Sequence, residues 1–253
     1  METNCIEIDG LLVMAKSSEH ESGHAMIAFR PFLPKEISVE KFAALIETAA
    51  AKCGREARFC RIRLERTQTE ELDTLKSMGF AIDGYEYKLD LDRVSELVGR
   101  TNIKLPSSFS IEEMSFDRDI DDVVALEKQV HAEDQSSRVN FDTQQAIDSM
   151  RRYYERATSG VGVFILRCGK TIVGVLGFMP DNEHSKTIHI SSVSIALAHQ
   201  GKGLFFPFLL GGLAHLDRES FKALTGVTTT EKLRKLASKH CLEPVSYSLI
   251  REL

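Results

Sequence analysis

The chain has 253 residues, of which 43% are hydrophobic and 27% charged, and its 32 Lys and Arg against 37 Asp and Glu leave a net charge of −5. This composition is ordinary for a folded protein with a sizeable core and excludes a largely disordered chain. Because there is no basic excess to neutralise phosphates, we expect no nucleic-acid partner.

The first third of the chain alternates between the strand period and the helix period. In the segment 58–65, Cys60, Ile62 and Leu64 alternate with polar or aromatic neighbours, which is typical of a strand with one buried face. Ser38 suits the N-cap of a helix that follows it. The expected strands are 11–16, 24–32, 58–65 and 85–91, and the expected helices are 39–52 and 70–78.

A stretch rich in Gly, Pro, Asn and Ser, residues 92–110, interrupts this pattern and predicts a linker. After it the alternation begins again, with a hairpin turning over Cys168, Gly169 and Lys170. The segments 69–77 and 230–238 resemble each other, which favours two related halves. The expected helices are 116–132, 143–158, 203–217 and 230–240, and the expected strands are 161–167, 171–179, 188–196, 221–227 and 244–251.

The cysteines and the apolar runs bear on location. Cys5, Cys53, Cys60, Cys168 and Cys241 are scattered and include no CxxC pair. We therefore expect no disulfide framework, no metal site and a reduced, cytoplasmic environment. The N-terminus has no basic region typical of a signal peptide, and the longest apolar run, 204–214, is too short to span a bilayer.

The segment Gln200, Gly201, Lys202, Gly203 and Leu204 joins an expected strand to an expected helix. Glycines at this place let the backbone approach a ligand closely, and the N–H groups of a first helical turn attract an anion. Lys202 adds a positive charge. The segment therefore predicts a phosphate-binding loop that is neither a Walker A loop nor a Rossmann fingerprint, although a plain helix cap has the same appearance.

From about residue 116 to residue 253 the order of elements resembles the GNAT superfamily of N-acetyltransferases. In that family a Gln/Arg-x-x-Gly-x-Gly/Ala loop after the fourth strand binds the pyrophosphate of acetyl-CoA, and Gln200 to Leu204 fit its first five positions. The resemblance implies acetyl-CoA as the cofactor, bound by this loop and by the backbone of the preceding strand end. The implied cofactor-binding residues are Val193, Ser194, Ile195, Gln200, Gly201, Lys202, Gly203 and Leu204.

The first third resembles the second half of the same fold, through Arg63-Leu64-Glu65, Leu75 and Gly79-Phe80. Its own strand-to-helix loop, 32–37, contains Pro34 and no glycine. The resemblance thus implies an α+β GNAT fold in tandem, with a central mixed, mostly antiparallel sheet flanked by helices. Residues 1–95 would form a partial, cofactor-free copy, 96–110 a linker, and 111–253 a complete domain.

The sequence departs from the family at positions that carry chemistry. Phe205 replaces the last Gly or Ala of the loop, Leu236 or Ala237 stands where a tyrosine acid is frequent, and Ser191 and Ser192 stand where a glutamate base is frequent. These departures leave two functions open. One is an N-acetyltransferase, and the other is a catalytically degenerate acyl-CoA-binding or regulatory module.

For the enzyme, His189 is the candidate base, and regular alternation would put it on one face with Ser191 and Val193. Ser238 is the candidate proton donor, and packing or surface roles are the alternatives for both.

Arg138 and Asn140 are candidates to contact the acceptor, in a loop that could equally be solvated. We expect Tyr153 and Tyr154 to be packing residues with hydroxyls in water. The expected partner is an amine of a small molecule or a protein. We expect no association with a membrane, and the sequence leaves open whether the protein forms a homodimer.

Overall fold

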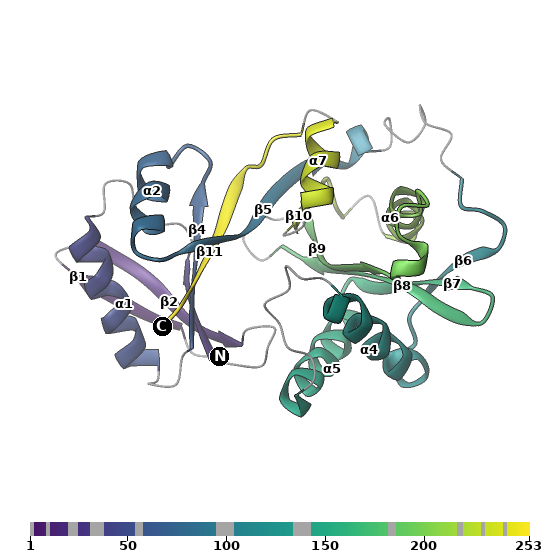
Figure 1. The fold of residues 1–253 in the computed structure, drawn as a ribbon, viewed down its shortest axis with the longest axis horizontal. Helices are drawn as coiled ribbons and strands as arrows, with labels where there is room; N and C mark the ends of the chain where they lie inside the picture. Colours follow the sequence, from purple (N-terminus) through teal and green to yellow (C-terminus); the bar gives the residue numbers. More distant parts are fainter. Residues whose placement is uncertain are drawn as a thin grey trace. The chain divides into compact units, whose positions relative to one another are not determined.

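The computed structural model describes residues 3–8, 11–19, 25–30, 38–53, 58–94, 104–133, 143–181, 186–216, 220–228, 231–239 and 242–253. The chain forms two compact units, unit 1 (Met1–Tyr87 and Val227–Leu253) and unit 2 (Lys88–Gly226). Figure 1 shows their elements coloured along the sequence. The predicted loop 32–37 lies outside the described residues.

Unit 1 is a mixed sheet with helices. Its strands follow the order β1-β2-β3-β4-β11-β5, in which β3 and β4 are parallel and the other described pairs are antiparallel. The elements are β1 Thr3–Ile8, β2 Leu11–Glu19, β3 Ala25–Arg30, α1 Val39–Cys53, β4 Phe59–Glu65, α2 Thr69–Ser77, β5 Ala81–Asp90, α7 Glu231–Lys239 and β11 Ser246–Glu252.

The core of unit 1 joins the apolar face of α1 to side chains of β3, β4, α2 and β11. The Ser38 hydroxyl accepts a hydrogen bond from the Lys41 N–H at 3.3 Å, which confirms the predicted cap. Strand β4 buries every second residue, as its sequence alternation predicts. The buried side chains of this cluster are Ile27, Phe42, Leu45, Ile46, Ala49, Cys60, Ile62, Leu64, Leu75, Phe80 and Leu249.

The last strand of the chain lies in unit 1. β11 pairs antiparallel with β4 along one edge and with β5 along the other, and its Leu249 is fully buried in the core of this unit. Residues 227–253, with α7 and β11, therefore group with the N-terminal part of the chain. This differs from the predicted division, which kept 111–253 together, because strand pairing joins segments that are far apart in sequence.

Unit 2 has the strand order β10-β9-β8-β7-β6, with β9 and β10 parallel and the other pairs antiparallel. The hairpin of β7 and β8 has the predicted turn. Strand β6 begins inside the segment that we expected to be a linker. The elements are β6 Phe109–Glu113, α4 Phe116–Glu133, α5 Gln144–Thr158, β7 Gly162–Cys168, β8 Thr171–Pro180, β9 Thr187–Ile195, the 3-10 turn η1 Leu197–His199, α6 Phe205–Ala214 and β10 Ala223–Thr228.

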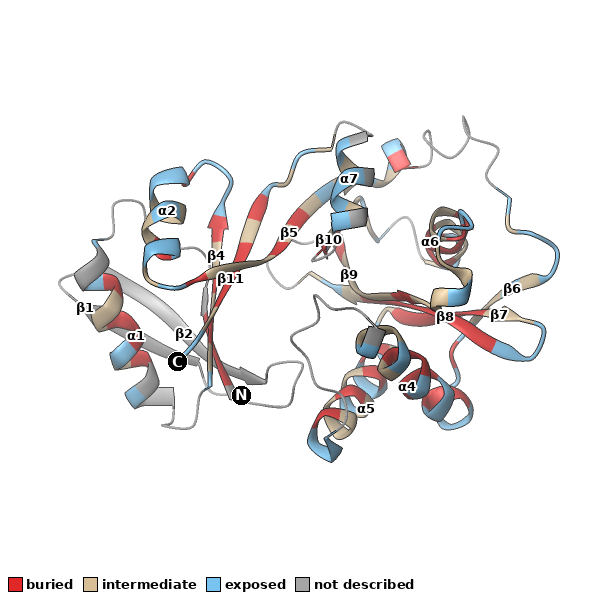
Figure 2. Cartoon of the chain, in the orientation of Figure 1, coloured by how far each residue is buried: buried red, intermediate tan, exposed pale blue. Residues whose placement is uncertain are grey.

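Helices cover both faces of the unit 2 sheet. Helices α4 and α5 pack together on one face against Val163, Ile165 and Val175, and α6 packs on the other face (Figure 1). Figure 2 shows that the buried residues of α4 and α5 turn toward the sheet while the exposed ones turn away. Along the regular parts of the strands, one side chain therefore faces the α4–α5 layer and the next faces the α6 layer.

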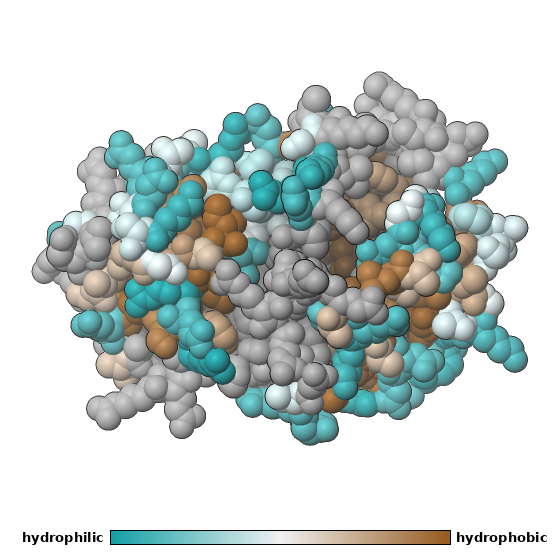
Figure 3. Space-filling model, viewed as in Figure 1, coloured by the Kyte–Doolittle hydropathy of each residue, from teal (hydrophilic) through white to brown (hydrophobic). Residues whose placement is uncertain are grey.

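The surface of the helices is polar where they meet solvent. Figure 3 shows hydrophilic side chains over α2 and over α7, whose Glu231, Arg234 and Lys235 are exposed. In the part of the chain that the structure describes, none of the helices combines the length and the hydropathy needed to cross a membrane.

Candidate functional site

Strand β9 loses one of its two neighbours halfway along its length. It pairs with β10 only through residues 187–190, whose partners are residues 223–226, whereas β8 accompanies it as far as Ile195. From Ser191 onward, the edge of β9 toward β10 therefore has no paired strand among the described residues. Backbone groups on such an edge can bind an extended ligand.

A β-bulge lies at the start of this open segment. Gly177 of β8 faces Ser192, and the next residue, Phe178, faces Ile190, so Ser191 is the extra residue. As a result Ser191 and Ser192 point to the same face of the sheet, toward Tyr153 and Tyr154 of α5.

The bulge reverses the alternation for the rest of β9. Val193 and Ile195 pack on the α6 side, whereas Ser194 is buried on the α4–α5 side. The expectation that Val193 shares a face with His189 and Ser191 is thus wrong, because regular alternation fails at the bulge.

The glycine loop follows β9 and leads into α6. The Gln200 Nε2 donates to the Ile195 carbonyl at 2.9 Å, which ties the loop to the strand end. Gly201 and Gly203 have φ values of +74° and +72°, and a Cβ added to either would meet nothing within 4 Å. Only glycine adopts this left-handed backbone without strain, and the space over both residues is open.

The start of α6 offers unpaired donors. Leu204 is its N-cap residue but makes no side-chain capping bond. Within the described chain the main-chain N–H groups of residues 201–205 have no hydrogen-bond partner. The positive end of the helix dipole adds to their attraction for an anion, and the exposed Lys202 adds a charge.

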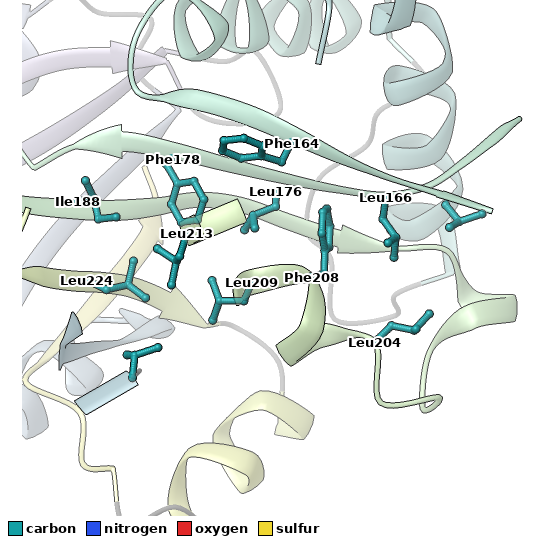
Figure 4. Close-up of a cluster of buried hydrophobic side chains, with 12 residues drawn as sticks. Phe164, Leu166, Leu176, Phe178, Ile188, Leu204, Phe208, Leu209, Leu213 and Leu224 are labelled. Carbon is teal, nitrogen blue, oxygen red and sulfur yellow. The ribbon is translucent and has the colours of Figure 1, made fainter. Parts of the chain in front are cut away.

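Helix α6 is anchored to the sheet by its apolar side chains. Figure 4 shows Phe208 pointing from α6 toward the sheet between Leu166 and Leu176. Leu204 is buried in the same cluster, and the Phe205 side chain packs against this cluster. The Phe205 ring therefore does not fill the open space beside Gly201 and Gly203. These contacts position the start of α6 and its N–H groups against the sheet.

A buried polar cluster lies on the opposite face of β9. Glu127 of α4 accepts hydrogen bonds from the Tyr154 hydroxyl at 2.5 Å and from the Ser194 hydroxyl at 2.7 Å. The Nε2 atom of His131 lies 3.4 Å from the Glu127 carboxylate, and the Tyr154 oxygen lies 3.4 Å from the Ser192 hydroxyl. We call Glu127, His131, Tyr154, Ser192 and Ser194 the carboxylate cluster.

The charges of this cluster follow from its contacts. Burial opposes ionisation of Glu127, but hydrogen bonds from His131, Tyr154 and Ser194 outweigh it and hold the pKa of the carboxyl below its ordinary value. Burial raises the pKa of Tyr153 to about 12, and burial with the Glu127 charge raises the pKa of Tyr154 well above its ordinary value. Near neutral pH the cluster thus holds the Glu127 carboxylate and the neutral Tyr154 phenol, and the neighbouring Tyr153 is neutral as well.

Sequence reasoning missed this cluster. The apolar face of α4 includes Ile120, Val123 and Val124, and the helical spacing puts Glu127 and His131 on the same face. A carboxylate on a buried helix face is the signal in the sequence that could have revealed the cluster.

Tyr153 and Tyr154 do not carry hydroxyls in water as we expected. The Tyr153 hydroxyl donates to Ser191 at 2.5 Å, and the side chain of Tyr154 is only 1% exposed. The turn of the bulge toward α5 brings serine hydroxyls to both rings.

The remaining candidates are dispersed. His189 is half-buried and lies on the same face of β9 as Ser191 and Ser192. Its Nδ1 lies 3.0 Å from the Thr225 hydroxyl, and these two residues form the last pair but one between β9 and β10. Ser238 is exposed on α7 of unit 1. Arg138 and Asn140 lie outside the described residues. Among the residues that can be described, no group of His, Cys, Asp or Glu is arranged to hold a metal ion.

Comparison with known proteins bears on the fold. No protein-family model and no curated protein matches the sequence. A tandem GNAT protein from the clavulanic acid biosynthesis pathway superposes with a TM-score of 0.62 at 12% identity, over 97% of this chain and 81% of that one. A GCN5-related N-acetyltransferase from Kribbella flavida superposes with a TM-score of 0.62 at 9% identity, over 98% of this chain and 88% of that one.

A second GCN5-related N-acetyltransferase, from Sphaerobacter thermophilus, gives a TM-score of 0.60 at 11% identity, over 96% of this chain and 78% of that one. The chain therefore has an α+β GNAT fold in a tandem arrangement, which confirms the fold predicted from the order of elements and the glycine loop.

Proposed function

We propose that the protein is an N-acetyltransferase that moves an acetyl group from acetyl-CoA to an amine of a small molecule or a protein in the cytosol. The observation that carries this proposal is the continuous path from the open edge of β9, through the Gln200 to Gly203 loop, to the uncapped start of α6. The fold that the chain shares with acetyltransferases supports it.

The residues on this path fit acetyl-CoA. The open backbone edge from Ser191 to Ile195 suits the amide groups of a pantetheine arm, which pair as a strand would. The N–H groups around Lys202 suit a pyrophosphate, and the open space over Gly201 and Gly203 leaves room for it. Both elements belong to unit 2, so one unit supplies the whole binding path.

Acetyl-CoA supplies an activated acyl group as a thioester. The chain then has to hold the carrier, orient the amine beside it and remove a proton from the amine. Backbone groups of the open β9 edge can orient the thioester and polarise its carbonyl, and such positioning supplies a large part of the rate of acyl transfer. His189 and the serines of β9 lie on the face where an amine would approach from the α4–α5 side.

Two measurements test the proposal. First, coenzyme A should raise the melting temperature, whereas pantetheine, which lacks the pyrophosphate, should raise it much less, because ligands specific to the folded state stabilise it by mass action. Second, thiol release from acetyl-CoA should accelerate with one member of an amine panel of lysine, spermidine, glucosamine and a lysine-containing peptide.

The outcomes separate the two functions. Stabilisation by coenzyme A without thiol release favours the acyl-CoA-binding or regulatory module, which the departures at Phe205 and at Leu236 or Ala237 also suggest. No stabilisation at millimolar coenzyme A contradicts both functions.

A further inference from the structure

The carboxylate cluster keeps a charge on the buried face of α4. Glu127 lies on the same face as Val123 and Val124 and is only 4% exposed, so an ionised carboxyl there has a desolvation cost. Three donors of the cluster compensate the charge. Because an apolar side chain of similar size would avoid the cost, the carboxylate points to a role beyond packing.

The hydrogen bonds of the cluster run toward Glu127. The Tyr154 hydroxyl has one proton, and Glu127 Oε1, at 2.5 Å, is a carboxylate oxygen that can only accept. At the second contact of Tyr154, which is 3.4 Å long, the proton therefore comes from the Ser192 hydroxyl, which rotates to suit. Ser192 thus donates to Tyr154, and Tyr154 donates to the carboxylate.

The Ser192 oxygen keeps its lone pairs for a donor from outside the cluster. The neighbouring Tyr153 supplies no proton to it, because Tyr153 gives its only one to Ser191 at 2.5 Å. Among the described residues, the two tyrosines are the only hydrogen-bond partners of the Ser192 side chain. Successive hydrogen bonds polarise one another, so the carboxylate at the end of the chain makes this oxygen a stronger acceptor.

Ser192 lies where an acceptor would meet the thioester. It is the first residue of β9 to pair with β8 after the bulge, and it belongs to the segment of β9 that no longer pairs with β10. Ser192 is half-buried, whereas Ser194 is only 8% exposed and bonded to the carboxylate. An incoming group can therefore approach Ser192 but not Ser194.

We propose that Ser192 binds the protonated amine of the acceptor, as the outer contact of a hydrogen-bond chain that ends at the Glu127 carboxylate. This inference rests on the proposed acetyl transfer and names its substrate class, an alkylamine that arrives as a cation. Ser192 touches the substrate, and Tyr154 and Glu127 are positioning residues that act through it. The bond holds the ammonium group beside the thioester and does not itself move a proton.

The chain suits a cation better than a neutral nucleophile. A hydrogen bond with an ionised partner is roughly twice as strong as one between neutral groups. An ammonium N–H donates such a bond to Ser192, and the buried negative charge also attracts the ion, because salt screens a buried charge much less than an exposed one. A neutral amine gains neither effect, so the site selects the ion.

The test measures kcat and KM for two nucleophiles on the full chain. The best alkylamine of the panel is protonated near neutral pH, as a lysine amine with a pKa of about 10.4 is. Hydroxylamine is neutral there, so its transfer depends on acetyl-CoA and on the open edge of β9 but not on a site for a cation. Damage to the carrier site or to the fold changes the kinetics of both nucleophiles.

We expect Glu127→Gln, which keeps the shape and removes the charge, to raise the KM for the alkylamine about tenfold, the scale of one charge-assisted hydrogen bond. The kcat for the alkylamine, the KM for acetyl-CoA and both constants for hydroxylamine should stay nearly unchanged, because the lost interaction serves only the binding of the cation. Ser192→Ala should raise the same KM. Adding Glu127→Gln to Ser192→Ala should have little further effect, because Glu127 acts through Ser192.

The matched control is Glu155→Gln. It makes the same change one residue away from Tyr154, on the exposed side of α5, where solvent and salt screen the charge. It should change none of these constants.

Each outcome decides the question. If the wild type transfers acetyl to neither nucleophile, the proposed function fails, and the ammonium site fails with it. If the wild type transfers to hydroxylamine but not to the alkylamines, or if Glu127→Gln leaves the KM for the alkylamine unchanged, the ammonium site is overturned and the transferase stands. Equal changes for both nucleophiles, or additive effects of Ser192→Ala and Glu127→Gln, overturn it as well. Stabilisation by coenzyme A shows that a variant is folded, and if Glu127→Gln is not, Tyr154→Phe should show the same selective rise in KM.

Discussion

The glycine loop allows a prediction in which stability and binding are separated by an internal control. Gly203 and Gly169 share a left-handed backbone, with φ of +72° and +61°, and a Cβ at either would meet nothing within 4 Å. Alanine at either position therefore costs only the backbone strain, roughly 1 kcal/mol. In a chain of this size that lowers the melting temperature by about 2–4 °C.

The two substitutions should differ once acetyl-CoA is present. At a ligand concentration of 100 times the Kd, the wild type gains about 2.7 kcal/mol. A methyl group on Gly203 occupies the open space over the loop and costs at least one charge-assisted bond to a main-chain N–H, worth about 1.5 kcal/mol or more. Affinity then falls about tenfold, which leaves about 1.4 kcal/mol of stabilisation at the same ligand concentration.

The assay is thermal unfolding of the wild type, Gly203→Ala and Gly169→Ala, with and without acetyl-CoA. Without ligand both variants should melt at the same lowered temperature. With ligand, Gly169→Ala should show the full increase and Gly203→Ala about half of it or less. Equal increases in the two variants would refute the assignment of the loop as the pyrophosphate site.

Three other substitutions test the surroundings of the site. The pKa of the Glu127 carboxyl is held below its ordinary value of 4.5 in the folded state. The ionised carboxylate therefore adds to the free energy of unfolding above pH 4.5, and this contribution is lost as the pH falls through the folded-state pKa. Glu127→Gln should therefore be less stable than the wild type near neutral pH. Urea unfolding should show that the difference in free energy of unfolding between the two proteins shrinks in acid, and a difference that does not change with pH would contradict this. Gly212→Ala should lower the free energy of unfolding by about 1–3 kcal/mol, because its Cβ would lie 2.8 Å from Leu176 Cδ2 and 3.1 Å from the Phe178 ring. Urea unfolding measures this loss, and an unchanged midpoint would show that α6 can shift to make room. Lys202→Ala should weaken coenzyme A binding more at low salt than at high salt, since an exposed charge is screened, and calorimetry with no salt dependence would exclude a role for this charge.

The β-bulge of β9 connects the fold to the proposed chemistry. Without it, Ser191 and Ser192 would point to opposite faces, and only one of them could reach the tyrosines of α5. Gly177 on β8 completes the arrangement, because a Cβ there would come within 2.9 Å of the Ser192 and Tyr153 oxygens. The bulge therefore places the hydroxyls on the acceptor side, and it lies where the pairing of β9 with β10 ends.

Local information in the sequence was sufficient for most of the elements and for the conformation of the glycine loop, but not for β1 or β6. Alternation in β4, the cap at Ser38 and the two glycines after β9 each express the conformational preference of a few neighbouring residues, so they could be recognised without partners. The likeness of element order to the GNAT fold followed from the same local signals. The positive φ of Gly201 and Gly203 is likewise a property that the residue type itself favours.

Tertiary structure alone decided which distant segments meet. The placement of β11 between β4 and β5 and the register shift at Ser191 depend on hydrogen bonds between strands far apart in sequence, and alternation within one strand carries no information about them. The same holds for Glu127, whose burial beside Ser194 needs α4, α5 and β9 to pack together. Residue types along one segment determine its conformation, but the chemical environment of a side chain is created by partners that only folding brings into contact.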